Sequence, residues 1–201
     1  EIALTARPSI SFDLLSLNIG SNPDACKIPG ADRFALGIKP IQKFIDHWQT
    51  LLKKAVHSIR QDKEYKIIIV GGGPASVELA FAAQFRIQKE LQLKSADASL
   101  LKIKIISADT NLLSLHNHKV RQFAKSELAK RGVEVILDTT VSAFEENIAV
   151  CENGNNYSAD LMVFATGASI PSWPGECGLA LSEDGFIEVN AHLQSTSHGC
   201  V

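Results

Sequence analysis

Three consecutive glycines, Gly71, Gly72 and Gly73, are followed by Pro74, Ala75 and Ser76. Gly71, Gly73 and Ser76 occupy the small positions of a G-x-G-x-x-small pattern. Small residues at this spacing allow a tight turn and let a pyrophosphate approach the N–H groups of a following helix. At Gly73 we expect a backbone conformation that larger residues disfavour. The pattern predicts dinucleotide binding by residues 71–76; the alternative is that the glycines serve only a tight turn.

The residues around the glycines favour the dinucleotide interpretation. The run Ile67-Ile68-Ile69-Val70 before them is typical of a strand buried on both faces, and an alanine-rich helical stretch follows from Pro74. Ser76 departs from the usual Gly or Ala, which weakens the pattern by the volume of one hydroxyl. No Lys-Ser or Lys-Thr pair follows the glycines, which excludes a P-loop.

An acidic residue that binds the ribose is expected at the end of the second strand. Ser107 lies at the expected position, and Asp109 follows two residues later. Asp109 is therefore the candidate ribose ligand, with a solvated loop acid as the alternative. The nine residues after Asp109 contain no Arg or Lys that could pair with a 2′-phosphate. This pattern favours NADH over NADPH.

Hydrophobic periodicity predicts the elements that position these residues. Helices are expected at residues 40–60, 74–93 and 116–131, the last closed by Gly132. Strands are expected at residues 10–17, 66–70, 103–107, 133–137, 140–144, 148–152 and 160–166. The order β-α-β-α-β followed by a meander predicts an α/β fold with a Rossmann-like, doubly wound parallel sheet and an antiparallel β-meander.

The composition excludes several classes of protein. The 201 residues carry a formal charge of −2, with 20 Lys and Arg against 22 Asp and Glu, so a nucleic-acid-binding face is not expected. No uncharged apolar run reaches the roughly 18 residues of a membrane span. The four cysteines lie too far apart for a redox pair or for zinc-ligand spacing, so we expect no metal site and a cytoplasmic location.

Three segments together resemble the FAD-dependent pyridine nucleotide-disulfide oxidoreductase superfamily. They run from Ile67 to Ala80, from Ala159 to Ala168 and from Asp184 to Ser195. Within that superfamily the chain is most similar to the type II NADH dehydrogenase-like branch. Residues Phe12 to Pro23, with Ile38-Lys39-Pro40-Ile41, resemble an oxidoreductase module that is fused to selenide, water dikinase in some proteins.

The resemblance implies a domain organisation. An NAD(P)H-binding Rossmann domain at residues 39–169 would be inserted into an FAD domain, of which residues 1–38 and 170–201 are partial segments. The main FAD-binding elements of the family would lie outside these segments, in the full-length protein. The chain begins without an initiator Met, and we expect it to be an excised fragment that is inactive alone.

The resemblance also adds site residues and partners. Glu78 would face the nicotinamide and the flavin; the alternative is that its carboxylate complements the helix dipole in the first turn. Thr166 and Gly167 would lie near the nicotinamide, or else form a plain strand exit. The expected function is hydride transfer from NADH to FAD and on to an unidentified acceptor, with a fused kinase module and a homodimer both compatible with it. The alternative is a nucleotide- or partner-binding domain without redox turnover.

Overall fold

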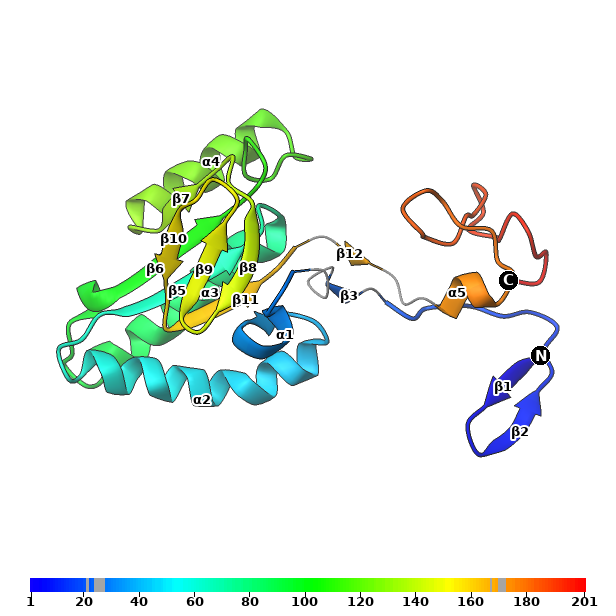
Figure 1. The fold of residues 1–201 in the computed structure, drawn as a ribbon, viewed down its shortest axis with the longest axis horizontal. Coiled ribbons are helices and arrows are strands. Elements are labelled where there is room, and N and C mark those ends of the chain that lie inside the picture. The colour runs from blue at the N-terminus through cyan, green and yellow to red at the C-terminus, as the bar shows by residue number, and fades with distance from the viewer. Residues whose placement is uncertain (21, 24–27, 167, 170–172) are drawn as a thin grey trace. The chain divides into compact units, whose positions relative to one another are not determined.

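The computed structural model describes residues 1–201 except residues 21, 24–27, 167 and 170–172. The chain divides into two compact units (Figure 1): unit 1 comprises residues 1–22 and 168–201, and unit 2 comprises residues 23–167. Strand β4 (Leu36–Gly37), which falls within the predicted flanking segment of residues 1–38, pairs with the central sheet of unit 2.

A five-stranded sheet forms the centre of unit 2. Its order is β4-β11-β5-β6-β7, and every neighbouring pair is parallel. The strands besides β4 are β5 (Tyr65–Val70), β6 (Leu101–Ile106), β7 (Glu134–Ile136) and β11 (Leu161–Phe164). Parallel strands with covered faces require apolar side chains on both sides, which explains the run of isoleucines in β5.

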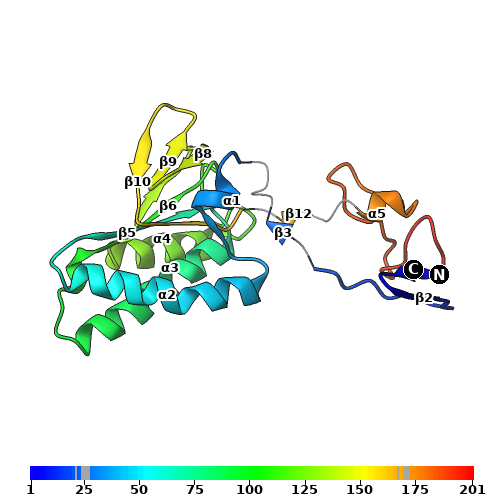
Figure 2. The same ribbon diagram turned by 60° about the horizontal axis from the view of Figure 1, so that its bottom comes forward.

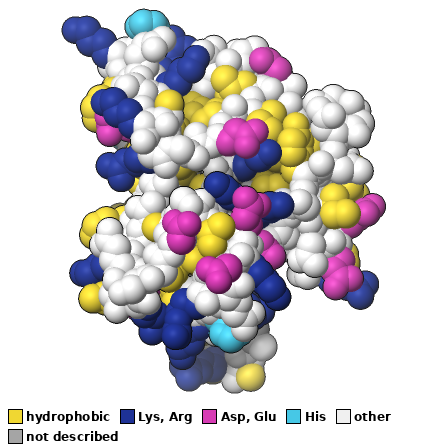
Figure 3. Space-filling model, turned by 90° about the vertical axis from the view of Figure 1, so that its left-hand side faces the viewer, with side chains coloured by type: hydrophobic (Ala, Val, Ile, Leu, Met, Phe, Trp, Pro, Cys, Tyr) yellow, Lys and Arg dark blue, Asp and Glu magenta, His cyan; other side chains and the backbone are white. Residues whose placement is uncertain are grey.

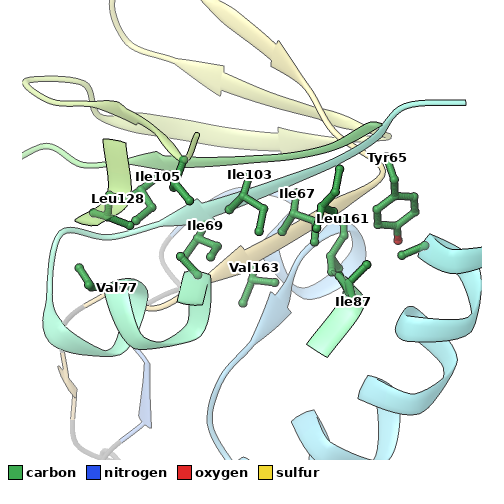
Figure 4. Packing of buried hydrophobic residues seen from close by; sticks show 14 of the residues in the cluster. Tyr65, Ile67, Ile69, Val77, Ile87, Ile103, Ile105, Leu128, Leu161 and Val163 are labelled. Atoms are coloured by element: carbon green, nitrogen blue, oxygen red, sulfur yellow. The ribbon is translucent and has the colours of Figure 1, made fainter. Parts of the chain in front are cut away.

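Three helices cover one face of this sheet (Figure 2): α2 (Ile41–Ile59), α3 (Pro74–Gln92) and α4 (His118–Lys130). Alternate strand residues point towards these helices and pack with Val77, Ile87 and Leu128 (Figure 4). Tyr65 lies at the edge of this cluster, where burial, and secondly the Asp160 carboxylate, raise its pKa to about 12. Its phenol therefore stays neutral at physiological pH.

An antiparallel meander covers the opposite face (Figure 2). It consists of β8 (Val141–Glu145), β9 (Ile148–Cys151) and β10 (Asn156–Ser158) in the order β10-β9-β8. A second core cluster joins Ile68, Val70 and Ile106 of the sheet to residues of the meander. Burial raises the pKa of the Cys151 thiol in β9, so this thiol is not activated as a nucleophile.

The predicted fold class, α/β with a parallel sheet and an antiparallel meander, is confirmed. The sequence analysis missed the short elements of unit 2: α1 (Ala31–Phe34), the 3₁₀ turn η2 (Ala98–Leu100), β4 and β10. Elements of two to four residues leave little room for a periodic pattern. Among the described residues, no helix is both long and apolar enough to cross a bilayer.

Unit 1 contains a hairpin of β1 (Ile2–Leu4) and β2 (Arg7–Ile10), and the short helix α5 (Trp173–Glu176). The Leu15 N–H donates to the Cys200 carbonyl, with 2.8 Å from N to O, which joins the two segments of the unit. The two-residue strands β3 (Asn22–Pro23) and β12 (Ala168–Ser169) lie at the boundaries between the units.

The predicted strand at residues 10–17 is wrong. Only Ile10 lies in a strand, and residues 11–17 belong to no helix or strand. Leu14 in this stretch is 80% exposed. Branched apolar residues favour a strand only where a neighbouring strand and a buried face are present, and this segment has neither in unit 1.

Candidate functional site

A pocket of about 580 Å³ in unit 2 lies where three neighbouring parallel strands end. Residues 70–75 line it after β5, residues 106–109 after β6, and residues 165–166 after β11. Carboxyl ends of parallel strands share one edge of a sheet, and ligands of open α/β sheets bind outside that edge. The structure therefore brings the predicted glycine turn together with the predicted ends of the other two strands.

Gly71 has a conformation and a neighbourhood that require glycine. Its φ is +129°, and a Cβ atom there would lie 2.6 Å from the Ala165 carbonyl oxygen. The Gly71 N–H donates to the Ile106 carbonyl, with 2.8 Å from N to O, so the turn is held against both adjacent strands. Any side chain would have to push these strand ends apart.

Gly72 is buried and packs against the end of β6. A Cβ atom on Gly72 would overlap the Ser107 Oγ and lie 3.2 Å from the Asp109 Oδ2. Its carbonyl accepts from the Leu113 N–H, with 2.8 Å between N and O. The middle glycine of the pattern thus ties the turn to the loop that follows β6.

Gly73 differs from the expectation. Its φ of −81° and ψ of 177° are open to any residue, so the predicted need for a disfavoured conformation is wrong. A Cβ atom there would meet nothing within 4 Å, although Gly73 lines the pocket. Gly73 is the N-cap of the 19-residue helix α3, and Pro74 follows at the first helical position. The open space lies at the positive end of that helix, where anions are favoured.

Ser107 and Asp109, the two ribose candidates, both line the pocket. Ser107 is 3% exposed, and its Oγ accepts from the Asp109 N–H at 3.1 Å. Asp109 is exposed, so its carboxylate is accessible to a ligand. The buried serine orients the loop, and the acid two residues later can contact a ribose hydroxyl.

Two predicted site residues carry buried hydroxyls without a partner. Within the described part of the chain, three buried side-chain polar atoms lack a hydrogen bond: Ser76 Oγ, Thr166 Oγ1 and Arg121 Nε. Thr166 also lines the pocket, and the Ser76 Oγ would lie 3.1 Å from a Cβ atom on Gly71. Buried polar groups are nearly always satisfied, so an unpartnered hydroxyl beside a pocket points to a ligand or water that completes it.

If the predicted NADH binds in this pocket and completes the Thr166 hydroxyl, the variant Thr166→Val should weaken binding about fivefold, because it would remove that hydrogen bond and keep the side-chain shape. The melting temperature should stay the same or rise slightly, since the free protein loses an unsatisfied hydroxyl. Calorimetric titration and thermal melting of the same preparation measure both effects. Unchanged affinity would exclude a ligand contact of this hydroxyl.

Glu78 does not lie where the sequence analysis placed it. The first turn of α3 contains no acidic residue, so Glu78 lies beyond that turn and the dipole interpretation is wrong. The side chain is exposed, and the residues that line the pocket do not include it. Glu78 follows Pro74 by four residues, on the same side of the helix. Gly167, the other predicted neighbour of the nicotinamide, lies outside the described residues.

The sequence analysis missed other pocket residues. Thr139 and Thr140 lie after β7, and the loop from Leu113 to His116 follows β6. The carboxyl-end rule could have found the threonines, because they follow a predicted strand.

Solved structures with this fold include the water-forming NADH oxidase from Lactobacillus brevis, which was solved with bound NADH. The superposition has a TM-score of 0.70 at 20% sequence identity and covers 95% of this chain and 38% of the oxidase. This likeness supports the fold.

Sequence comparison identifies related proteins. Demethylphylloquinone reductase of Synechocystis sp. is 26% identical over 191 residues, which are 92% of this chain and 44% of the relative. Type II NADH:quinone oxidoreductase of Haemophilus influenzae is 27% identical over 139 residues, 67% of this chain and 31% of that enzyme. The chain therefore spans less than half the length of these relatives. The family model of the pyridine nucleotide-disulphide oxidoreductases matches residues 5–200, and the chain belongs to that family.

Proposed function

We propose that unit 2 binds NADH as the nucleotide-binding part of an FAD-dependent oxidoreductase. When both cofactors are bound, hydride passes from NADH to FAD and on to an acceptor that is not identified. The observation that carries this proposal is the pocket at the strand ends, where the Gly73 position is open and faces the N-terminus of α3. Membership of the family supports the same function.

Different residues of this chain would bind different parts of NADH. Backbone groups at Gly73 and Ala75, with the positive end of α3, would hold the pyrophosphate. Asp109 would accept hydrogen bonds from a ribose, and Thr166 would donate its free hydroxyl near the nicotinamide. Glu78, beyond the pocket, would act only on a ligand that extends along the exposed side of α3.

The acceptor is the least constrained part of the proposal. Both relatives described above are named for the reduction of a quinone. A quinone is therefore the first acceptor to test. The assignment of residues 1–38 and 170–201 to an FAD domain, the cytoplasmic location, the homodimer and the fused kinase module stay predictions.

Absorption spectroscopy of the full-length protein tests the function directly. We expect a yellow preparation whose flavin band bleaches on addition of NADH under anaerobic conditions and returns on addition of a quinone. The 201-residue chain alone should bind NADH and stay colourless. A full-length preparation that binds NADH without any flavin would favour the alternative, a nucleotide-binding module without redox turnover.

NADH should bind more tightly than NADPH, because the acidic Asp109 lines the pocket and, among the described residues, no Lys or Arg side chain does so. We expect a preference of about tenfold, as for one unfavourable contact between exposed like charges next to a partly desolvated site. The variant Asp109→Asn should reduce this preference. Titration of both proteins with both nucleotides measures it, and tighter binding of NADPH to the unmodified chain would contradict the ribose assignment.

A further inference from the structure

A second groove in unit 2, of about 320 Å³, runs between the carboxyl-terminal halves of α2 and α3. Lys53, His57 and Arg60 line it from the α2 side, and Arg86, Glu90 and Lys94 line it from the α3 side. Positions four residues apart lie on one side of a helix, so each helix presents a row of charged side chains to the groove. None of these residues lines the nucleotide pocket.

The charges in this groove do not balance. Among the described residues, Glu90 is the only acid that lines it, and its Oε1 lies 2.8 Å from Arg86. Lys53, Arg60 and Lys94 are exposed and take part in none of the ion pairs within the described part of the chain. Figure 3 shows Lys and Arg side chains over much of one side of the molecule, several of them near the bottom of the view together with a histidine. A chain with a net charge of −2 thus concentrates three unpaired cations in one concave surface.

Helix dipoles explain only part of this excess. Cations are favoured near helix C-termini, and both α2 and α3 end beside this groove. Each helix end carries about half a negative charge, so two ends offset about one of the three cations. Roughly two positive charges therefore remain for a partner.

We propose that the groove between α2 and α3 binds a phosphate-bearing dianion. A dianion matches the residual charge, and the arginine side chain at Arg60 offers a planar set of N–H donors for phosphate oxygens. The buried side chains of Leu52 and Val56 also line the groove. The phosphate belongs either to a small soluble ester or to the headgroup of an anionic lipid.

NMR titration of the ¹⁵N-labelled 201-residue chain with inorganic phosphate and with pyrophosphate tests the site. Amide signals distinguish this groove, at residues 53–60 and 86–94, from the glycine turn at residues 71–76, which could also bind pyrophosphate. The test variant is Lys53→Gln, Arg60→Gln, Lys94→Gln. The control variant, Lys43→Gln, Lys119→Gln, Lys125→Gln, removes three exposed cations outside the groove.

We expect saturable shifts in the groove residues, with a dissociation constant about tenfold higher in the test variant and little changed in the control. Co-sedimentation with phosphatidylcholine vesicles that contain phosphatidic acid distinguishes the lipid source. Vesicle binding that is lost in the test variant and kept in the control supports a headgroup. Equal weakening in both variants, shifts confined to residues 71–76, or no response to phosphate or vesicles would each overturn the proposal.

Discussion

The variant Gly73→Val is expected to weaken NADH binding about 100-fold and to lower the melting temperature by no more than about 2–4 °C, the cost of a poorer N-cap on α3. The new side chain would enter the open space at the start of α3, where the pyrophosphate must approach the helix amides. A 100-fold loss of affinity corresponds to about 2.8 kcal/mol, the order of one or two charge-assisted hydrogen bonds between the pyrophosphate and the helix amides. The fold should be kept, because the backbone conformation of Gly73 suits any residue and no atom lies within 4 Å of the added Cβ.

Calorimetric titration with NADH and thermal melting of the same preparation measure the two effects. Gly73→Ala is the graded control, since a single methyl group intrudes less and should weaken binding less. Normal NADH affinity of Gly73→Val would mean that the glycine turn does not receive the pyrophosphate. The proposed function would then lose its main support.

The variant Gly71→Ala should lower the free energy of unfolding by about 3 kcal/mol, through an unfavourable φ and overlap with a backbone carbonyl. Gly71 has a φ of +129°, and its Cβ would lie 2.6 Å from the Ala165 oxygen. In a chain of this length, 3 kcal/mol corresponds to a fall of about 6–12 °C in melting temperature. NADH binding should also be lost, because the end of β11 must move.

The variant Gly132→Ala separates the cost of a positive φ from the cost of the overlap with the Ala165 carbonyl. Gly132 also has a positive φ, +70°, but a Cβ atom there would meet nothing within 4 Å. Gly132→Ala should therefore cost only about 1 kcal/mol, from the backbone conformation alone. Denaturant unfolding of the two variants measures the difference. If Gly71→Ala and Gly132→Ala lost the same free energy of unfolding, the overlap with the Ala165 carbonyl would be relieved without cost. The strand ends at the pocket would then be less rigid than their hydrogen bonds indicate.

Much of unit 2 could be predicted because its elements have strong local patterns. The isoleucines before Gly71 need two covered faces, and the apolar residues of α2 repeat at helical spacing. The predictions that failed concern segments whose structure depends on residues far away in the sequence or on a neighbouring strand. Leu14 has strand propensity but no strand to pair with, and β10 exists because β9 lies beside it.

The candidate site was predictable in part for the same reason. Gly71 and Ser107 follow strands, so a rule about strand ends places them together. The sequence could not distinguish the three glycines, because the Ala165 carbonyl that excludes a side chain at Gly71 comes from a strand about 95 residues later. Nor could it show that Thr166 lacks a hydrogen-bond partner, which depends on every atom around it.

The division of the chain has a consequence for its synthesis. Residues 1–22 emerge from the ribosome before unit 2, but their partners at residues 168–201 emerge only after all of unit 2. At about 5–20 residues per second, that interval lasts roughly 7–30 s. The hydrogen bond between Leu15 and Cys200 can form only after this interval. Unit 2 therefore has time to fold first. Its folding shortens the loop that unit 1 must close to bring its two segments together. Mutations that slow the folding of unit 2 should therefore also delay the folding of unit 1.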